Sequence, residues 1–369
     1  MPMLTLLECG LSTAFASGMD ATQAAIVEEK SVLFRYETFI GSDFQPQLCA
    51  FRDNSRIGEF APRLRELVQE ATADLVARIS ALDAISSDLY GRRAKLVIVL
   101  PEIDDASGLD RISLSSLGRD LIDEMCSSLS NDLGLIISET VIRAAGHAGV
   151  GSAVADHLIE PSPELADIVL VAAVDSYNDR QRLNRLNDQK RLFTKQNQFG
   201  FVPGEAAGIL LFKRKTATTS SLQVLGAGHM VESVKEDQEA DSVFTALSEA
   251  AFTATEMALK SSNERSISAW IADWNNSRYR ATELSFAIHR LNAACLQEGL
   301  SPVYPALEFG DVGAAYGCLA IILARSARSF PSIFSVDHAE ASAAQENTFL
   351  VSAGSVMSGL RSAMVLSTS

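Results

Sequence analysis

The stretch GFVPGEAAG carries the clearest chemical character, because it places one carboxylate, Glu205, directly after a Pro-Gly pair. Gly204 can take a backbone conformation that other residues avoid, and Pro203 stiffens the chain before it. Gly204 and Glu205 are therefore candidates for substrate contact. Glu205 could equally be a buried structural carboxylate that caps a turn, since perturbed carboxylates are often members of structural ion pairs.

Thiol chemistry is a second possibility that the sequence raises. The five cysteines are scattered along the chain without a CxxC spacing, at Cys9, Cys49, Cys126, Cys295 and Cys318. This pattern fits neither a disulfide framework nor a zinc cluster, and we expect no metal or cofactor. Cys318 follows a Gly-rich segment and is the thiol that we would test first, although free cysteines are usually buried and inert.

The elements that must position these residues follow from the apolar pattern. In the first half, five short apolar runs predict strands at residues 4–7, 96–100, 135–137, 168–174 and 209–212. Runs without polar alternation are buried on both faces, which is typical of a parallel or mixed sheet covered by helices. Apolar residues spaced three and four apart predict a helix at 57–82, and a second helix is predicted at 148–159.

The second half repeats this alternation. Strands are predicted at residues 222–225, 269–273, 303–306, 333–336, 349–352 and 363–366, and helices at 243–259, 281–298 and 312–328. Between the halves, the polar stretch KRKTATTSS breaks the apolar pattern. The sequence therefore predicts an α/β protein of two halves, residues 1–215 and 222–369.

Composition limits the range of partners. The 369 residues include 31 Lys and Arg against 46 Asp and Glu, a net charge of −15. Such a charge repels phosphate backbones and acidic lipids, so we expect no general role in nucleic-acid or membrane binding. The N-terminus has no basic segment before an apolar run, and no apolar run reaches the roughly 18 residues of a membrane span. We expect a soluble, cytoplasmic protein.

Several segments together resemble the thiolase superfamily and, within it, the β-ketoacyl-acyl-carrier-protein synthases. ADIVLVAAVDS and GFVPGEAAGILLF are similar to a strand and a turn-strand unit of that family, with Ala206 where Gly is usual. Three further segments resemble family segments and occur in the family's order along the chain: GLSTAFASGMDA near the start, GDVGAAYG at 310–317 and FLVSAGSVMSGLRSAMVL near the end. The family's usual GFGG-type loop is absent from the last of them. The resemblance implies a thiolase-like five-layer αβαβα sandwich of two similar halves, usually a homodimer.

The resemblance also implies where catalysis would occur. Active members load an acyl group onto a cysteine at the N-terminus of a buried helix, where the helix lowers the thiol pKa and offers N–H donors to an oxyanion. Two histidines, or a histidine and an asparagine, then stabilise the enolate. The cysteine position falls on His147, or on Gly146 if the register shifts by one, and the other two positions fall on Asn275 and Asp311. All three positions are substituted.

These substitutions argue against ordinary condensation. An acyl group on the imidazole of His147 would hydrolyse readily, and the carboxylate of Asp311 would repel an enolate. We therefore expect a divergent member that binds acyl thioesters or an acyl-carrier protein and partners an active synthase, as chain-length factors do. An acyltransferase or thioesterase is the alternative, with His147 and Asp311 as a dyad that activates water or a hydroxyl. Equally, His147 could be a core or capping histidine and Asp311 a helix N-cap.

Further side chains could contribute to binding. Three aromatic residues flank the Asn275-Asn276 loop and could line an acyl or pantetheine channel: Trp270, Trp274 and Tyr279. Aromatic residues beside a strand are more often core. Trp274 and Tyr316 are our candidates for substrate binding. A run of six basic residues between 180 and 195 could dock an acidic acyl-carrier protein, because rim charges steer association. A solvated helix face also explains this run.

Overall fold

The computed structural model describes residues 3–52, 57–105, 108–159, 166–214, 222–235, 242–261, 267–292, 294–297, 299–327 and 347–368. The first half supplies five strands of one sheet. They are β1 (Leu4–Thr13), β4 (Arg93–Leu100), β5 (Ile136–Ala144), β6 (Ile168–Ser176) and β7 (Glu205–Arg214). β4 lies parallel to β5 and β6, whereas β7 is antiparallel to β6 and β1. All nine residues of β6 are buried, as its unbroken apolar run predicts.

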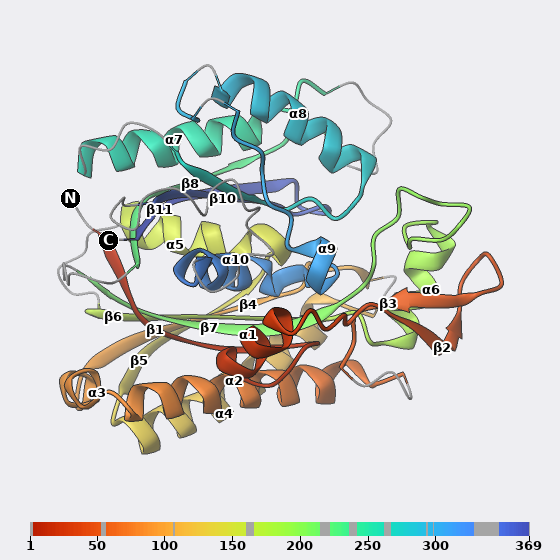
Figure 1. Cartoon of the computed structure of the whole chain (residues 1–369). Helices are drawn as coiled ribbons and strands as arrows, with labels where there is room; N and C mark the ends of the chain where they lie inside the picture. Colours follow the sequence, from red (N-terminus) through yellow and green to blue (C-terminus); the bar gives the residue numbers. More distant parts are fainter. Residues whose placement is uncertain are drawn as a thin grey trace.

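The second half continues the same sheet. Its strands are β8 (Leu222–Val231), β9 (Ala269–Ala272), β10 (Asn347–Gly354) and β11 (Leu360–Thr368). The complete order is β5-β4-β6-β7-β1-β8-β11-β10-β9, and β1 joins β8 only through Leu4 and Thr5. At this short junction the sheet passes from one layer of the molecule to another (Figure 1).

Helices complete a five-layer arrangement (Figure 1). α2 (Phe60–Ser80), α3 (Asp83–Leu89) and α4 (Arg111–Leu133) lie on the outer side of the first strands, and α7 (Ala246–Ser261) and α8 (Arg278–Asn292) on the outer side of the second. α5 (Gly149–Ile159) and α10 (Tyr316–Arg325) lie between the two strand layers. The predicted thiolase-like αβαβα sandwich is confirmed.

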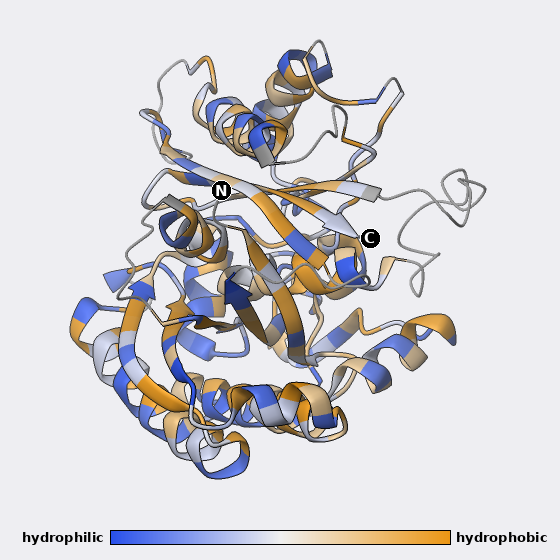
Figure 2. Cartoon of the chain, turned by 90° about the vertical axis from the view of Figure 1, so that its left-hand side faces the viewer, coloured by the Kyte–Doolittle hydropathy of each residue, from blue (hydrophilic) through white to orange (hydrophobic). Residues whose placement is uncertain are grey.

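Three apolar cores lie between the five layers. The central one joins α5 and α10 to strands of both layers, with Val150, Ile322 and Leu210 among its fully buried members. The two outer cores pack α2 and α4, and α7 and α8, on the remaining sheet faces. In Figure 2 hydrophobic residues follow the strands, while the outer helices carry both hydrophobic and hydrophilic residues. The amphipathic pattern of α2 accounts for this difference, because one stripe of the helix is enough to cover a sheet face.

A small satellite of elements lies at one side. It consists of the antiparallel pair β2 (Phe34–Ile40) and β3 (Pro46–Cys49) together with α6 (Arg180–Asp188), and it shares a core that includes Tyr36 and Leu183. The short helices α1 (Met19–Val27) and α9 (Ala306–Phe309) and two 3₁₀ turns, η2 (Gly146–Ala148) and η3 (Gly313–Ala315), complete the assigned elements. No described helix is long and apolar enough to cross a membrane.

Some predicted elements need correction. The strand at 303–306 is wrong: Val303 forms one isolated bridge with Ile271, and α9 begins at 306 directly after Pro305. A proline has no N–H for a strand ladder and tolerates a helix start, which accounts for the change. The predicted strand at 333–336 lies outside the described residues. The helix predicted at 312–328 starts as η3 and becomes α-helical only at Tyr316.

The predicted division into halves 1–215 and 222–369 stays a prediction. Residues 215–221, which make up most of the polar stretch at this boundary, lie outside the described residues. The central core contains residues from both halves, because α5 belongs to the first half and α10 to the second. The functional residues are therefore best sought where these two helices begin.

Candidate functional site

His147 lies in η2, the 3₁₀ turn that leads from β5 into α5. Gly146 precedes it with a φ of +60°, and a Cβ atom at this position would lie 2.6 Å from Cγ of Glu102. Ser355 fixes the turn from the other half: its hydroxyl accepts a hydrogen bond from the N–H of Ala148 at 2.9 Å and donates one to the carbonyl of Ala145 at 2.6 Å. The position of the imidazole is therefore set by contacts from both halves.

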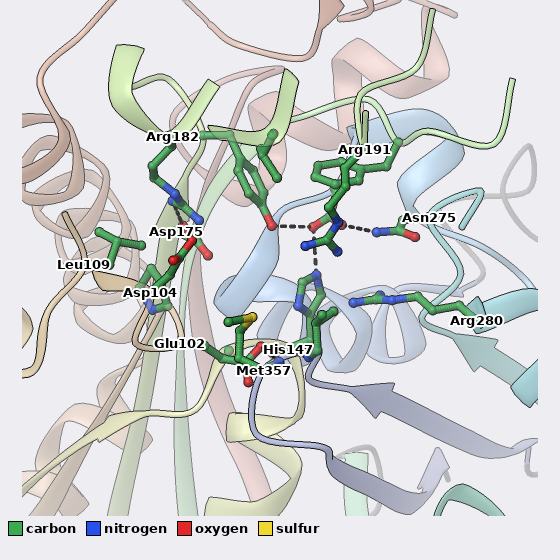
Figure 3. Close-up of a pocket in the computed structure, with 17 residues that line it drawn as sticks. Glu102, Asp104, Leu109, His147, Asp175, Arg182, Arg191, Asn275, Arg280 and Met357 are labelled. Carbon is green, nitrogen blue, oxygen red and sulfur yellow. Dashed lines mark hydrogen bonds and ion pairs between the residues drawn. The ribbon is translucent and has the colours of Figure 1, made fainter. Parts of the chain in front are cut away.

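Asp311 lies at the equivalent place before the other central helix, and its carboxylate meets His147. Nε2 of His147 and Oδ1 of Asp311 are 2.7 Å apart, and Asn275 donates to Oδ2 from its amide. Figure 3 shows His147 and Asn275 approaching this carboxylate from different elements. The structure thus brings together the three residues that the resemblance selected. Their catalytic role stays a prediction.

Asp311 also has a structural task. The N–H of Gly313 donates to its Oδ1 at 2.8 Å, so the carboxylate binds the first turn of η3 as an N-cap would. Its backbone is fixed by the Pro-Gly-Glu segment, because Asp311 donates to the carbonyl of Val202 at 2.7 Å and accepts from Gly204 at 2.8 Å. The dyad and capping interpretations of Asp311 are therefore both compatible with one geometry.

Electrostatics favour the charged forms of both partners. Burial lowers the pKa of His147, but the charges of Asp311 and Asp273 and the hydrogen bond to Asp311 together outweigh this effect, and the pKa of the ring is raised. Burial raises the pKa of Asp311, whereas the charge and hydrogen bond of His147, followed by the charge of Arg280, hold it well below its usual range. These effects favour a pair made of an imidazolium and a carboxylate.

The pair faces a cavity of about 80 Å³. Its lining includes Glu102, His147, Tyr177, Arg191, Arg280 and Asp311 (Figure 3). Typical ligand pockets are about 300–1,000 Å³, so this space admits only a small group. Two of the charged groups around it form ion pairs, Asp175 with Arg182 at 2.5 Å and Arg280 with the neighbouring Asp273.

The residues predicted to bind substrate lie elsewhere. Glu205 is fully buried, and its carboxylate accepts from the guanidinium of Arg63 at 2.6 and 2.9 Å and from the hydroxyl of Ser176 at 2.9 Å. Gly204 is required for packing, because a Cβ atom there would lie 2.6 Å from the carbonyl oxygen of Phe309. Neither residue is among the described lining of the cavity. Their geometry matches the structural alternative, in which Glu205 is an ion-pair member.

The two aromatic candidates also lie outside the described lining. Trp274 packs edge-on against Tyr304, with ring centroids 4.9 Å apart. The ring of Tyr316 lies 6.5 Å from the ring of His147, and its buried hydroxyl has no hydrogen-bond partner among the described residues. A role of Trp274 and Tyr316 in substrate binding stays a prediction.

The basic run between 180 and 195 does not form one surface. Arg182 is buried, pairs with Asp175, and lies 4.2 Å from the ring centroid of Tyr177. It is therefore unavailable for docking, and this part of the prediction is wrong. Lys190, Arg191 and Lys195 do line a groove of about 590 Å³.

This groove adjoins the cavity. Arg191 and Phe201 belong to the lining of both spaces. Residues 277–279 of the second half also line the groove, and the guanidinium of Arg278 lies 3.7 Å from the ring centroid of Phe199.

The sequence analysis identified the basic residues of the groove only as a run of charges, and it missed the cavity residues Glu102, Tyr177 and Arg280. Glu102 had a usable signal, because it follows the apolar run of β4, where parallel strands end beside their neighbours.

None of the five thiols lies at the start of α5. Burial raises the pKa of Cys318, the thiol that we would test first, well above its usual range. Burial also raises the pKa of Cys9, to about 11. Burial also raises the pKa of Cys49, Cys126 and Cys295. Among the described residues, no group of three or more His, Cys, Asp or Glu side chains could hold a metal ion.

The architecture is a thiolase-like fold, in which His147 and Asp311, each just before a central helix, meet at one cavity. No protein-family model and no curated protein sequence matches the chain. Solved structures do. A ketosynthase from module 6 of the bacillaene synthase of Bacillus subtilis 168 has a TM-score of 0.69 at 13% identity, with 100% of this chain and 72% of that chain covered.

Two complexes with partner proteins contain similar chains. One is a type II polyketide synthase acyl-carrier protein with its ketosynthase bound to the hexaketide (TM-score 0.68, 15% identity, 100% and 99% coverage). The other is a ketosynthase with its chain length factor from Xenorhabdus doucetiae (TM-score 0.65, 12% identity, 99% and 98% coverage). At these identities the comparison establishes the fold: this chain has the ketosynthase fold.

Proposed function

We propose that this protein is a non-condensing ketosynthase-like subunit that binds an acyl group or an acyl-carrier protein and works beside an active ketosynthase. The observation that carries this proposal is the ion pair of His147 and Asp311 at the start of α5, where the family's nucleophilic cysteine is expected. Condensation needs a nucleophile that stores the acyl group. The raised pKa of His147 favours the protonated ring, and an imidazolium has no free electron pair with which to attack a thioester.

The electrostatics also weigh against the alternative acyltransferase or thioesterase. A general base must be able to accept a proton, and the charges of Asp311 and Asp273 raise the pKa of His147 and favour its protonated form. The cavity of about 80 Å³ leaves little room for a substrate beside the pair. His147 and Asp311 do share this cavity, which is the one observation that favours the dyad.

The direct test is hydrolysis and acyl transfer with a panel of acyl-pantetheine thioesters, comparing wild type with His147→Ala. Our proposal expects background rates and no covalent acyl-protein in both, because the pair is charged and structural. A wild-type rate well above background that is lost in His147→Ala would establish the dyad chemistry instead. Intrinsic fluorescence of each variant checks that it is folded.

The basic groove is the proposed docking face for the acyl-carrier protein. Lys190, Lys195 and Arg278 lie along it in a protein of net charge −15, so they would attract an acidic partner locally. Binding of a fluorescent holo acyl-carrier protein from a type II polyketide synthase tests this. Lys190→Glu with Lys195→Glu should weaken binding at least about tenfold, whereas Lys30→Glu, an exposed lysine outside the groove lining, should leave it unchanged. Equal binding by all forms would remove the docking face.

The proposed subunit contact is the free edge of β5, the terminal strand of the sheet. Ser138, Glu139 and Thr140 are exposed along it, and an open edge is a template for pairing with another strand. We infer that a second ketosynthase-fold chain pairs here, with a homodimer as the simplest case. Sedimentation should show a dimer for wild type and a monomer for Thr140→Lys, because lysine on an edge opposes pairing. A dimer that persists in the variant would place the contact elsewhere.

A further inference from the structure

We propose that Glu102 is an internal latch, whose carboxylate holds the turn at residues 355–358 closed over the His147 cavity. Oε2 of Glu102 accepts from the N–H groups of Val356 at 2.8 Å and Met357 at 3.2 Å. Oε1 accepts from the N–H and the hydroxyl of Ser358, both at 2.8 Å. Three successive N–H groups aimed at one anion form a nest, and hydrogen bonds to a charged acceptor are stronger than neutral ones.

The latched turn forms part of the cavity wall. Val356, Met357 and Glu102 itself all line the cavity. In Figure 3, Glu102 and Met357 lie on the side away from the groove residue Arg191. The outer side of the turn faces solvent, and Met357 is 38% exposed. The turn thus has one side on the cavity and the other on solvent. Movement of residues 356–358, the tip of the turn, would therefore open the cavity on this side.

The ends of the turn are fixed independently of Glu102. The N–H of Ser355 donates to the carbonyl of Leu360 at 2.8 Å, and Arg361 donates to the carbonyl of Ser355 at 2.8 Å while paired with Glu283 at 2.6 Å. Release of Glu102 would therefore free residues 356–358 without separating β10 from β11. This division into fixed ends and a tip held by one carboxylate is what distinguishes a latch from an ordinary turn.

Glu102 is also placed to link the turn to His147. Its Cγ occupies the space next to Gly146, the residue before His147. When the latch opens, the same side chain leaves both Gly146 and the turn. Glu102 thus controls both access to the imidazole of His147 and the mobility of residues 356–358. The purpose of this access, entry of an acyl group, rests on the proposed function, but opening of the latch can be measured without any acyl ligand.

The first test is hydrogen exchange at the N–H groups of Val356, Met357 and Ser358 in wild type and in Glu102→Ala. The latch predicts that their exchange becomes at least about tenfold faster in the variant, while the β10–β11 ladder keeps its protection. Sodium acetate should restore the protection by filling the vacated nest. Glu256→Ala, which removes an exposed carboxylate from α7, is the control and should change nothing. Unchanged exchange in Glu102→Ala would overturn the proposal.

The second test measures entry into the cavity. A thiol placed by His147→Cys should react with iodoacetamide at least about tenfold faster when Glu102→Ala is added, and acetate should slow the reaction again. Acceleration by Arg191→Ala but not by Glu102→Ala would show that entry is through the groove, and would also overturn the latch. Neither readout depends on thioesters or on a carrier protein, so failure of the latch and failure of the proposed function are distinguishable.

Discussion

Nε2 of His147 lies 2.7 Å from Oδ1 of Asp311, although 164 positions separate them in the sequence. Each residue stands at the entrance of a central helix, His147 before α5 and Asp311 before α10. The positive ends of two helix dipoles favour the carboxylate and disfavour the imidazolium. The imidazolium therefore depends on Asp311, and the buried ion pair joins a residue of each predicted half.

The pKa of His147 should fall when the carboxylate is removed. In Asp311→Asn the charge that raises this pKa is lost, while burial, which lowers it, remains. We expect the pKa of His147 to drop below the ordinary value of about 6.5. A titration of the imidazole protons by NMR in both proteins measures it. A pKa of His147 that is equal in both proteins would contradict the charge pair.

Stability should depend on pH in a way that His147→Gln removes. Because the folded pKa of His147 is raised, its contribution is complete below the unfolded value of about 6.5 and is lost as pH rises through the folded pKa. The lowered pKa of Asp311 adds stability above about 3.9 that is lost as pH falls. Urea unfolding should therefore show the largest advantage of wild type over His147→Gln between about pH 4 and 6.5. An advantage that grows above pH 7 would refute this assignment.

Much of the fold could be predicted from the sequence, because its strands are unusually apolar. β6 was found from an unbroken run, and α2 from apolar residues spaced three and four apart. α4 was missed, although Asp110 caps it and Leu114, Leu121 and Leu129 continue its buried stripe. The many serines of α4 interrupt its apolar residues, so the helical spacing was not recognised in the sequence. The strand predicted at 303–306 is wrong because the prediction considered the apolar residues and ignored Pro302 before the run and Pro305 within it.

The candidate site could be predicted only in part. His147, Asn275 and Asp311 were found together because family order, and not local pattern, selected them. Glu102 and Tyr177 could not be found in this way, since their place at the cavity depends on how β4 and the segment after β6 meet in space. Glu205 shows the opposite case: its motif was conspicuous in sequence, but its partners make it structural.

The ion pair of Glu205 and Arg63 should be important for folding. Glu205 is fully buried, so Glu205→Ala would leave the guanidinium without its counter-charge and lower the free energy of unfolding by about 3–5 kcal/mol. Glu66→Ala is the matched control, because it removes an exposed partner of the same arginine and should cost about 0–1 kcal/mol. Urea unfolding compares them. Similar losses in both variants would mean that burial of this pair has no special weight.

A methyl group at Gly313 should disturb the site through Asp175. Gly313 has a φ of +54°, and a Cβ atom there would lie 1.9 Å from Oδ2 of Asp175, which pairs with Arg182. Gly91 has a φ of +75° with nothing within 4 Å, so Gly91→Ala isolates the backbone penalty of about 1–2 kcal/mol. In urea unfolding, Gly313→Ala should cost clearly more than Gly91→Ala, because the carboxylate must move away from Arg182. Equal losses would mean that Asp175 adjusts freely and that the first turn of η3 is not fixed by this contact.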